Sequence, residues 1–127
     1  MKNKYYTPEV EEFHVGFEYQ VLDGDVWINE VVGLDNTGDL EFLKDLIIEE
    51  SCRVKYLDRE DIESLGFVTY MKSVKDSFKL GSTVIRLKVE QILIFRYDEY
   101  TIDELLFKGT IKNKSELKRI LKQLNII

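Results

Sequence analysis

Hydrophobic and polar residues alternate from residue 13 onward, which is typical of a β-strand with one buried face. Between Phe13 and Val21 every second residue is apolar, and the residues between them are His, Gly, Glu and Gln. The pair Asp23-Gly24 follows and favours a tight hairpin turn. A second strand is expected from Val26 to Val32, with Trp27 and Ile28 on opposite faces. The pattern therefore predicts an N-terminal β-hairpin.

Capping residues and apolar stripes predict three helices. The first is expected over residues 40–50 after an N-cap at Asp39, and the second follows Asp58 and ends before Gly66. The third is expected after the N-cap Asn113. Its apolar residues recur with helical spacing at Leu117, Ile120, Leu121 and Leu124. This C-terminal helix is amphipathic, so we expect it to pack on a sheet.

Further strands are expected where β-branched and aromatic residues gather, at 52–57, 67–73, 83–89, 92–97 and 105–111. The stretch 74–81 is polar and is interpreted as a connection that closes on Gly81. Strands joined by hairpin turns, with few helices between them, predict an α+β fold with a mostly antiparallel sheet. We expect one domain over residues 1–127, with 1–9 as a loosely ordered arm.

Composition places the chain among ordinary globular proteins. It has 127 residues, of which 44% are hydrophobic and 33% charged, and a single cysteine, Cys52. One cysteine excludes a disulfide within the chain and a cysteine-cluster metal site. The apolar runs are shorter than a membrane span, and the first residues lack a secretory pattern. The expected location is therefore the cytosol.

Charge is distributed unevenly along the chain. Residues 1–50 hold three Lys and thirteen Asp or Glu, whereas residues 51–127 hold fifteen Lys or Arg and eleven acids. We favour the interpretation that the two halves neutralise each other within one fold. The alternatives are that two copies pair in a homodimer, or that an acidic face meets a basic partner.

The one histidine, His14, lies between Glu12 and Glu18, which raises the question of a metal or acid–base site. On the predicted strand the three side chains share one face. Glu12 and Glu18 would then be about 20 Å apart, too far to share an ion. We therefore predict no metal site, and we interpret Glu12, His14 and Glu18 as part of a surface that faces solvent or a partner.

Catalytic motifs are not found in the sequence. Asp98, Glu99, Asp103 and Glu104, with Lys108, could in principle serve a hydrolase or nuclease. However, no phosphate-binding loop, dinucleotide turn, nucleophile elbow or zinc-protease pattern accompanies them. We expect a protein that is not an enzyme and has no cofactor.

Aromatic and basic residues supply the candidate binding surfaces. Rings with a hydroxyl tolerate a wet edge, and arginines can pair with phosphate, so we expect a partner or ligand surface that includes Tyr56, Tyr70, Arg86, Arg96 and Tyr97. The polar side of the C-terminal helix carries Lys114, Lys118, Arg119 and Lys122. This side could face an anion, although the acidic N-terminal half makes binding of nucleic acid an unfavoured alternative.

Three segments resemble a family of small uncharacterised bacteriophage and prophage proteins, especially those of Bacteroidota-type hosts. The segments are YYTPEVEEFHVGFEY at 5–19, RVKYLDREDIESLGF at 53–67 and LFKGTIKNKSELKRILKQLNI at 106–126. The resemblance covers about half of the chain and is weaker over 68–104, where a lineage-specific surface is expected. It implies a small accessory protein that acts in the host cytosol.

The resemblance and the lack of a catalytic motif favour a binding protein of phage type, acting through protein–protein contact. Inhibition of a host defence factor is the activity that this setting suggests. The first alternative is a ligand sponge that sequesters a nucleotide signal with aromatic and arginine side chains. The second alternative is binding of nucleic acid by the basic C-terminal helix.

Overall fold

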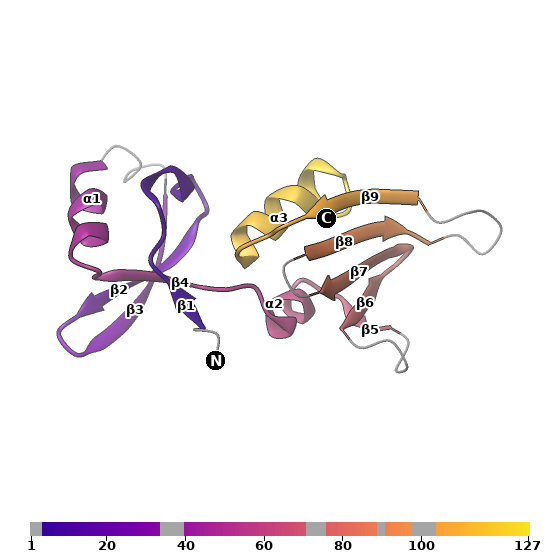
Figure 1. Cartoon of the computed structure of the whole chain (residues 1–127), viewed down its shortest axis with the longest axis horizontal. Helices are drawn as coiled ribbons and strands as arrows, with labels where there is room; N and C mark the ends of the chain where they lie inside the picture. Colours follow the sequence, from indigo (N-terminus) through magenta and orange to yellow (C-terminus); the bar gives the residue numbers. More distant parts are fainter. Residues whose placement is uncertain (1–3, 34–39, 71–75, 89–90, 98–103) are drawn as a thin grey trace. The chain divides into compact units, whose positions relative to one another are not determined.

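The computed structural model describes residues 4–33, 40–70, 76–88, 91–97 and 104–127 (Figure 1). Contacts within the chain gather in two compact units, Met1–Tyr56 and Leu57–Ile127, which we call the N-terminal and C-terminal units. Each unit has its own antiparallel sheet and its own helices, so the predicted α+β class is confirmed. A single domain over residues 1–127 stays a prediction that unfolding experiments can test.

The N-terminal unit is built on a four-stranded sheet of order β1-β4-β2-β3. Its strands are β1 (Tyr5–Tyr6), β2 (Glu18–Asp23), β3 (Val26–Val31) and β4 (Cys52–Lys55), and its helices are the 3₁₀ turn η1 (Val10–Glu12) and α1 (Leu40–Ile48). The hairpin expected around Asp23-Gly24 is confirmed. Asp23 pairs with Val26, and Gly24 has a φ of 64°, a conformation that glycine adopts without strain.

The prediction of a strand from Phe13 to Val21 is wrong for the first half of this segment. Residues 10–12 form η1, and a turn follows in which the Phe17 N–H donates to the His14 carbonyl over 2.9 Å. Gly16 has a φ of 92° in this turn, which ends any extended conformation, and β2 begins only at Glu18. The apolar alternation arises because the turn itself directs Phe13 and Phe17 inward, with ring centroids 4.9 Å apart.

One face of the four-stranded sheet carries the core of the N-terminal unit. Two clusters of buried residues meet there, Phe17 with Val32 and Val54, and Leu43 and Leu46 of α1 with Cys52. Leu43 and Leu46 lie three residues apart on α1 and both face this core, which is the spacing of an apolar helix stripe. Asp39, the expected N-cap, lies outside the described residues. Tyr5 and Tyr6, within the segment 1–9, pair with Lys55 and Val54 of β4.

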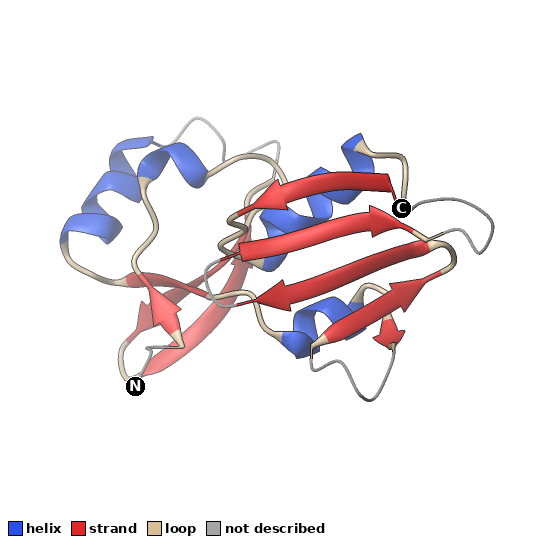
Figure 2. Ribbon diagram, turned by 45° about the vertical axis from the view of Figure 1, so that its right-hand side comes forward, coloured by secondary structure: helices blue, strands red, loops and turns tan. Residues whose placement is uncertain are grey.

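The C-terminal unit contains a five-stranded sheet in which each strand pairs with the next in the chain (Figure 2). The strands are β5 (Val68–Thr69), β6 (Ser77–Leu80), β7 (Thr83–Lys88), β8 (Gln91–Arg96) and β9 (Glu104–Gly109), and the helices are α2 (Arg59–Ser64) and α3 (Lys114–Gln123). The strand β6 falls in the stretch 74–81, where the polar residues predict a connection, so that prediction is wrong for Ser77–Leu80. Its sequence Ser-Phe-Lys-Leu alternates, but four residues are too few to distinguish a strand from a loop.

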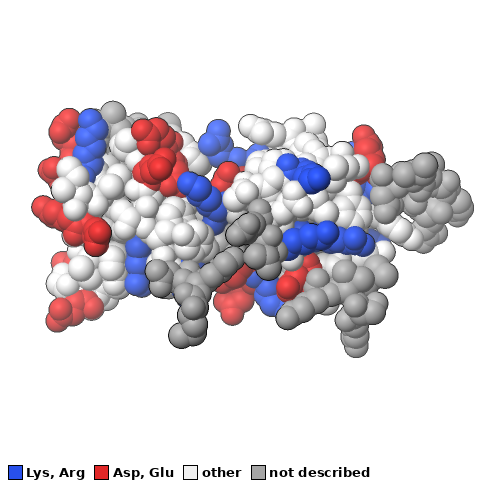
Figure 3. All heavy atoms as spheres, in the orientation of Figure 1, with Lys and Arg blue, Asp and Glu red and all other residues white. Residues whose placement is uncertain are grey.

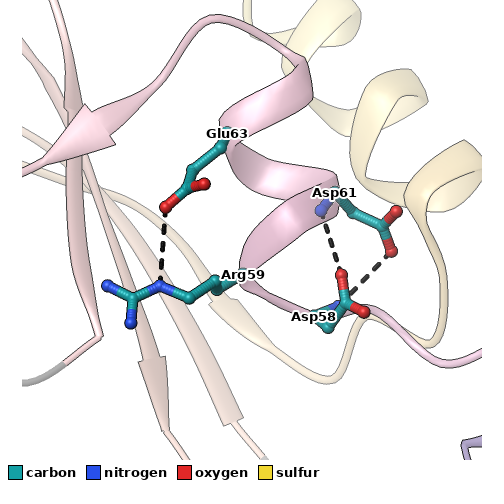
Figure 4. A network of polar contacts seen from close by, with 4 residues as sticks. All are labelled: Asp58, Arg59, Asp61 and Glu63. Carbon is teal, nitrogen blue, oxygen red and sulfur yellow. Dashed lines mark hydrogen bonds and ion pairs between the residues drawn. The ribbon is translucent and has the colours of Figure 1, made fainter.

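Both helices begin at the predicted caps. The Asp58 side chain accepts from the Asp61 N–H over 3.0 Å, and the Asp58 N–H donates back to the Asp61 carboxylate over 3.4 Å (Figure 4). Asn113 accepts from the Glu116 N–H over 2.8 Å at the start of α3. In α2, an exposed ion pair joins Arg59 and Glu63 over 3.5 Å, which adds little to stability.

The helices α2 and α3 pack on the same face of the five-stranded sheet. One buried cluster joins the helices to the sheet. It contains Ile62 of α2 and Leu117 and Leu121 of α3. It also contains one residue from each of the three central strands, namely Phe78, Ile85 and Ile94. Packing of the C-terminal helix on a sheet is thus confirmed. Because side chains alternate between faces along a strand, the other face carries a separate set of residues, and neither α2 nor α3 covers it.

Candidate binding surfaces

The side chains of Glu12 and His14 have structural partners within the N-terminal unit. The Glu12 carboxylate accepts from the Tyr6 hydroxyl over 2.6 Å and from the Glu9 N–H over 2.7 Å. His14 Nδ1 lies 2.8 Å from the Glu12 carbonyl, which can only accept, so Nδ1 carries the proton in this contact. These contacts stabilise η1 and the following turn, and Glu12 is therefore an architectural residue.

Glu18 does not share a strand with Glu12 and His14, because it begins β2 whereas they lie in and after η1. The expectation that these three residues share one strand face is therefore wrong. Tyr56 follows β4, is exposed over 44% of its surface and stacks on Tyr6 with ring centroids 4.6 Å apart. Within the described residues, no group of three or more His, Cys, Asp or Glu side chains is arranged to hold a metal ion.

Cys52 is buried in the N-terminal core, and burial raises the pKa of its thiol to about 11. A thiol with this pKa is almost entirely protonated at neutral pH, so it is a poor nucleophile. Tyr19 packs against the same cluster, and its pKa is raised by burial first and then by Glu30 and Cys52. Both groups behave as core residues.

The raised pKa of the Cys52 thiol predicts that the protein loses stability at high pH. Cys52 titrates near 9.0 when unfolded and near 11 when folded, so the unfolded chain loses its proton first as the pH rises. Stability of the N-terminal unit should therefore decline between about pH 9 and about pH 11. In urea unfolding followed across this range, Cys52→Ala should show a smaller decline than the unchanged protein. If the unfolding free energies of the two proteins depended on pH in the same way, the raised pKa of the Cys52 thiol would be contradicted.

The strand β3 forms one edge of the N-terminal sheet. Val32 donates its N–H over 3.0 Å to the carbonyl of Phe17, the residue just before β2, so the backbone groups of Val31, Asn29 and Trp27 point away from β2. Among the residues that the structure describes, none outside β2 forms a backbone hydrogen bond with Val26–Val31. With respect to the described part of the chain, the outer backbone of β3 is therefore unpaired.

The Arg53 guanidinium contacts β3 on the face of the sheet opposite the core and stabilises its position. Arg53 Cζ lies 3.7 Å from the ring centroid of Tyr5 and 4.1 Å from that of Trp27, so the cation is enclosed between two rings from different strands. Its Nε donates to Gln20 over 2.7 Å, and Gln20 donates to Asn29 of β3 over 2.9 Å. These contacts connect all four strands and fix the position of the edge.

The second face of the five-stranded sheet combines cations with aromatic rings. We call this surface the basic sheet face; its strand residues are Val68, Ser77, Lys79, Val84, Arg86, Lys88, Gln91, Leu93, Phe95, Leu105 and Lys108. Four of these residues are Lys or Arg and none is Asp or Glu. In Figure 3, basic side chains are visible over the C-terminal unit, and carboxylates are visible on both units.

Two sets of contacts organise the basic sheet face. Lys79 Nζ lies 5.1 Å from the Tyr70 ring centroid and 5.4 Å from that of Tyr97, and these two rings are 6.2 Å apart. Arg86 Cζ lies 5.2 Å from the ring centroid of Phe95. The structure therefore brings together Tyr70, Tyr97 and Arg86, three of the residues expected in a ligand surface.

The other predicted surface residues lie elsewhere. Arg96 is on the face that packs against the helices, at the exposed end of β8, where it pairs with Glu104 over 3.4 Å. Lys118, Arg119 and Lys122 are exposed on α3, whereas Lys114 at its start is half-buried. Glu12, His14, Glu18 and Tyr56 belong to the N-terminal unit. Asp98, Glu99 and Asp103 lie outside the described residues.

Sequence reasoning missed Lys79, Ser77 and Phe95 of the basic sheet face. The pattern does not predict the strand β6, which holds Ser77 and Lys79, and Phe95 lacks the hydroxyl or charge by which the candidate residues are chosen. The alternation Val84-Arg86-Lys88 along β7 was the available signal, since it places two cations on one face.

Comparison of the chain with protein-family models, curated proteins and solved structures finds no match. The resemblance to phage proteins therefore stays a prediction. No helix in the described ranges is both long and apolar enough to cross a membrane.

Proposed function

We propose that the protein acts by binding another protein through the edge strand β3, and that it is not an enzyme. The observation that carries this proposal is an exposed apolar edge. Val26, Val31 and Ile28 are 63%, 52% and 40% exposed, and the strand carries one charged residue, Glu30. Proteins normally protect such edges with lysine, proline or a covering element, because free backbone groups recruit further strands.

An extended segment of a partner could add to β3 as a fifth strand of the N-terminal sheet. Its backbone would pair with the outward groups of Trp27, Asn29 and Val31, and its side chains would contact the exposed valines and isoleucine. The enclosure of Arg53 between Tyr5 and Trp27 supports this mode, since a rigid edge loses little conformational entropy on binding.

Charge favours a basic partner segment. Residues 1–56 hold thirteen Asp or Glu and five Lys or Arg, a net charge of −8. Such a surface accelerates association with a basic segment and disfavours an acidic one. The resemblance to phage proteins points to a host protein in the cytosol as the partner. If that partner is a defence factor, pairing of its extended segment with β3 would inhibit it by making this segment unavailable.

Site-specific cross-linking tests this proposal. A photoreactive amino acid at Val26 should yield a discrete cross-link to a partner in host cells, and the same amino acid at Val68 should not. The two valines form a matched pair, because both lie in strands and they are 63% and 64% exposed. Mass spectrometry of the cross-linked peptide should place the partner's contact in an extended, basic segment.

Val31→Pro should abolish the cross-link at Val26. The Val31 N–H points away from β2, so proline removes no hydrogen bond of the sheet and blocks only a strand that adds to the edge. Val31→Thr, which keeps the N–H, should retain the cross-link. Equal cross-linking in all three proteins would refute edge pairing. A cross-link between two copies of this chain would replace the proposed partner by a homodimer.

A further inference from the structure

Among the described residues of the C-terminal unit, two buried polar atoms have no hydrogen-bond partner, Ser77 Oγ and Arg86 Nε. Ser77 is completely buried, and it lies directly opposite Arg86 on the neighbouring strand, with both side chains on the basic sheet face. Side chains that face each other in this way have Cβ atoms about 5 Å apart. The two donors can therefore reach a common acceptor.

Buried donors without a partner are uncommon in folded proteins, because each one forfeits its hydrogen bonds to water. A hydroxyl and a guanidinium can both donate, and a group with several anionic oxygens accepts from both at once. The strand residues of the basic sheet face include no carboxylate that could fill this role. With respect to the strand residues of this face, the pair thus has the chemistry of an anion site without a protein anion.

A ring surface lies beside this pair. The Tyr70 N–H donates to the Ser77 carbonyl over 2.8 Å, which places Tyr70 next to Ser77 in the row that crosses β6 and β7. The Tyr97 ring is 6.2 Å from that of Tyr70, and Lys79 lies near both. Aromatic rings stack on nucleobases, and a lysine beside them attracts phosphate.

From this juxtaposition we propose that the basic sheet face binds a nucleotide, with its phosphate at Ser77 and Arg86 and its base against Tyr70 and Tyr97. Lys88, two residues beyond Arg86 on β7, and Lys108, across Leu93 on β9, add positive potential around the phosphate. Because Ser77 is completely buried, the proposed site requires side chains on this face to move when the phosphate enters, and we expect Arg86, whose Cζ lies 5.2 Å from the Phe95 ring centroid, to be one of them. The site is independent of the partner proposed for β3.

Isothermal titration calorimetry with the four ribonucleoside 5′-monophosphates, adenosine and inorganic phosphate tests the proposal. At least one monophosphate should bind more tightly than adenosine or phosphate alone, since each of these fills only half of the site. Ser77→Ala and Arg86→Gln should each weaken binding about 10- to 100-fold, the range of one hydrogen bond to a charged group. Lys118→Ala, on the exposed side of α3, should leave binding unchanged.

Folding and binding can be separated in this experiment. Ser77→Ala removes a hydroxyl without a partner, so its melting temperature without nucleotide should equal or exceed that of the unchanged protein. The proposal fails if no monophosphate binds, or if Ser77→Ala binds as tightly as the unchanged protein. It also fails if only a ten-residue oligothymidylate binds and Lys118→Ala weakens it, because α3 would then be the anion site.

Discussion

Phe78→Ala should remove most of the stability of the C-terminal unit. Phe78 is completely buried on β6 and belongs to the cluster that joins α2, α3 and the sheet. Truncation of a buried phenylalanine costs about 3–5 kcal/mol, because transfer free energy is lost and a cavity remains. A typical domain is stable by only about 5–15 kcal/mol, so the variant should unfold at a much lower urea concentration.

Phe42→Ala is the matched control for this experiment. Phe42 lies on α1 and is 53% exposed, so truncation of its ring should change the unfolding free energy by less than about 1 kcal/mol. An equal loss of stability in the two variants would contradict the burial of Phe78 between the sheet and its helices.

Phe17→Ala should have an effect of similar size on the N-terminal unit. Phe17 is 1% exposed and packs against Val32 and Val54, and its ring lies 4.9 Å from that of Phe13 and 6.2 Å from that of Tyr19. We expect a loss of about 3–5 kcal/mol. The turn that precedes β2 should open as well, because Phe17 is its last residue.

Hydrogen exchange can then show whether the units unfold separately. Phe17→Ala should accelerate exchange in β2 and β4, and Phe78→Ala should accelerate it in β6, β7 and β8, each with little change in the other unit. If either variant accelerated hydrogen exchange in both sheets, the chain would unfold as the single domain that its sequence predicts. Faster exchange confined to the unmutated unit would contradict both core assignments.

Several elements could be predicted because their signals are local. Asp23-Gly24 specifies a turn within four residues, and Asp58 and Asn113 cap helices whose apolar stripes follow directly. The α+β class follows from the same signals, since hairpins and short helices exclude long parallel crossovers. None of these features depends on a residue that is distant in the chain.

The candidate surfaces could be predicted only in part. Tyr70, Tyr97 and Arg86 were expected to act together, but a residue type does not reveal its neighbours on adjacent strands. Lys79 comes near both tyrosines because β6 lies beside β5 and β7, and β6 itself was not expected. The exposed edge β3 also depends on strand order, which pairing between distant segments determines.

Short-range chemistry in the chain thus specifies the hairpin, the capped helices and their core-facing stripes, since each needs only residues within a turn or two. Long-range pairing specifies the rest. Gly16 turns the backbone where the apolar alternation indicates a strand, and this turn is stabilised by contacts of Phe17 with Val32 and Val54. Ser77 and Arg86 become neighbours through strand register, because packing selects one register from many that the sequence pattern permits.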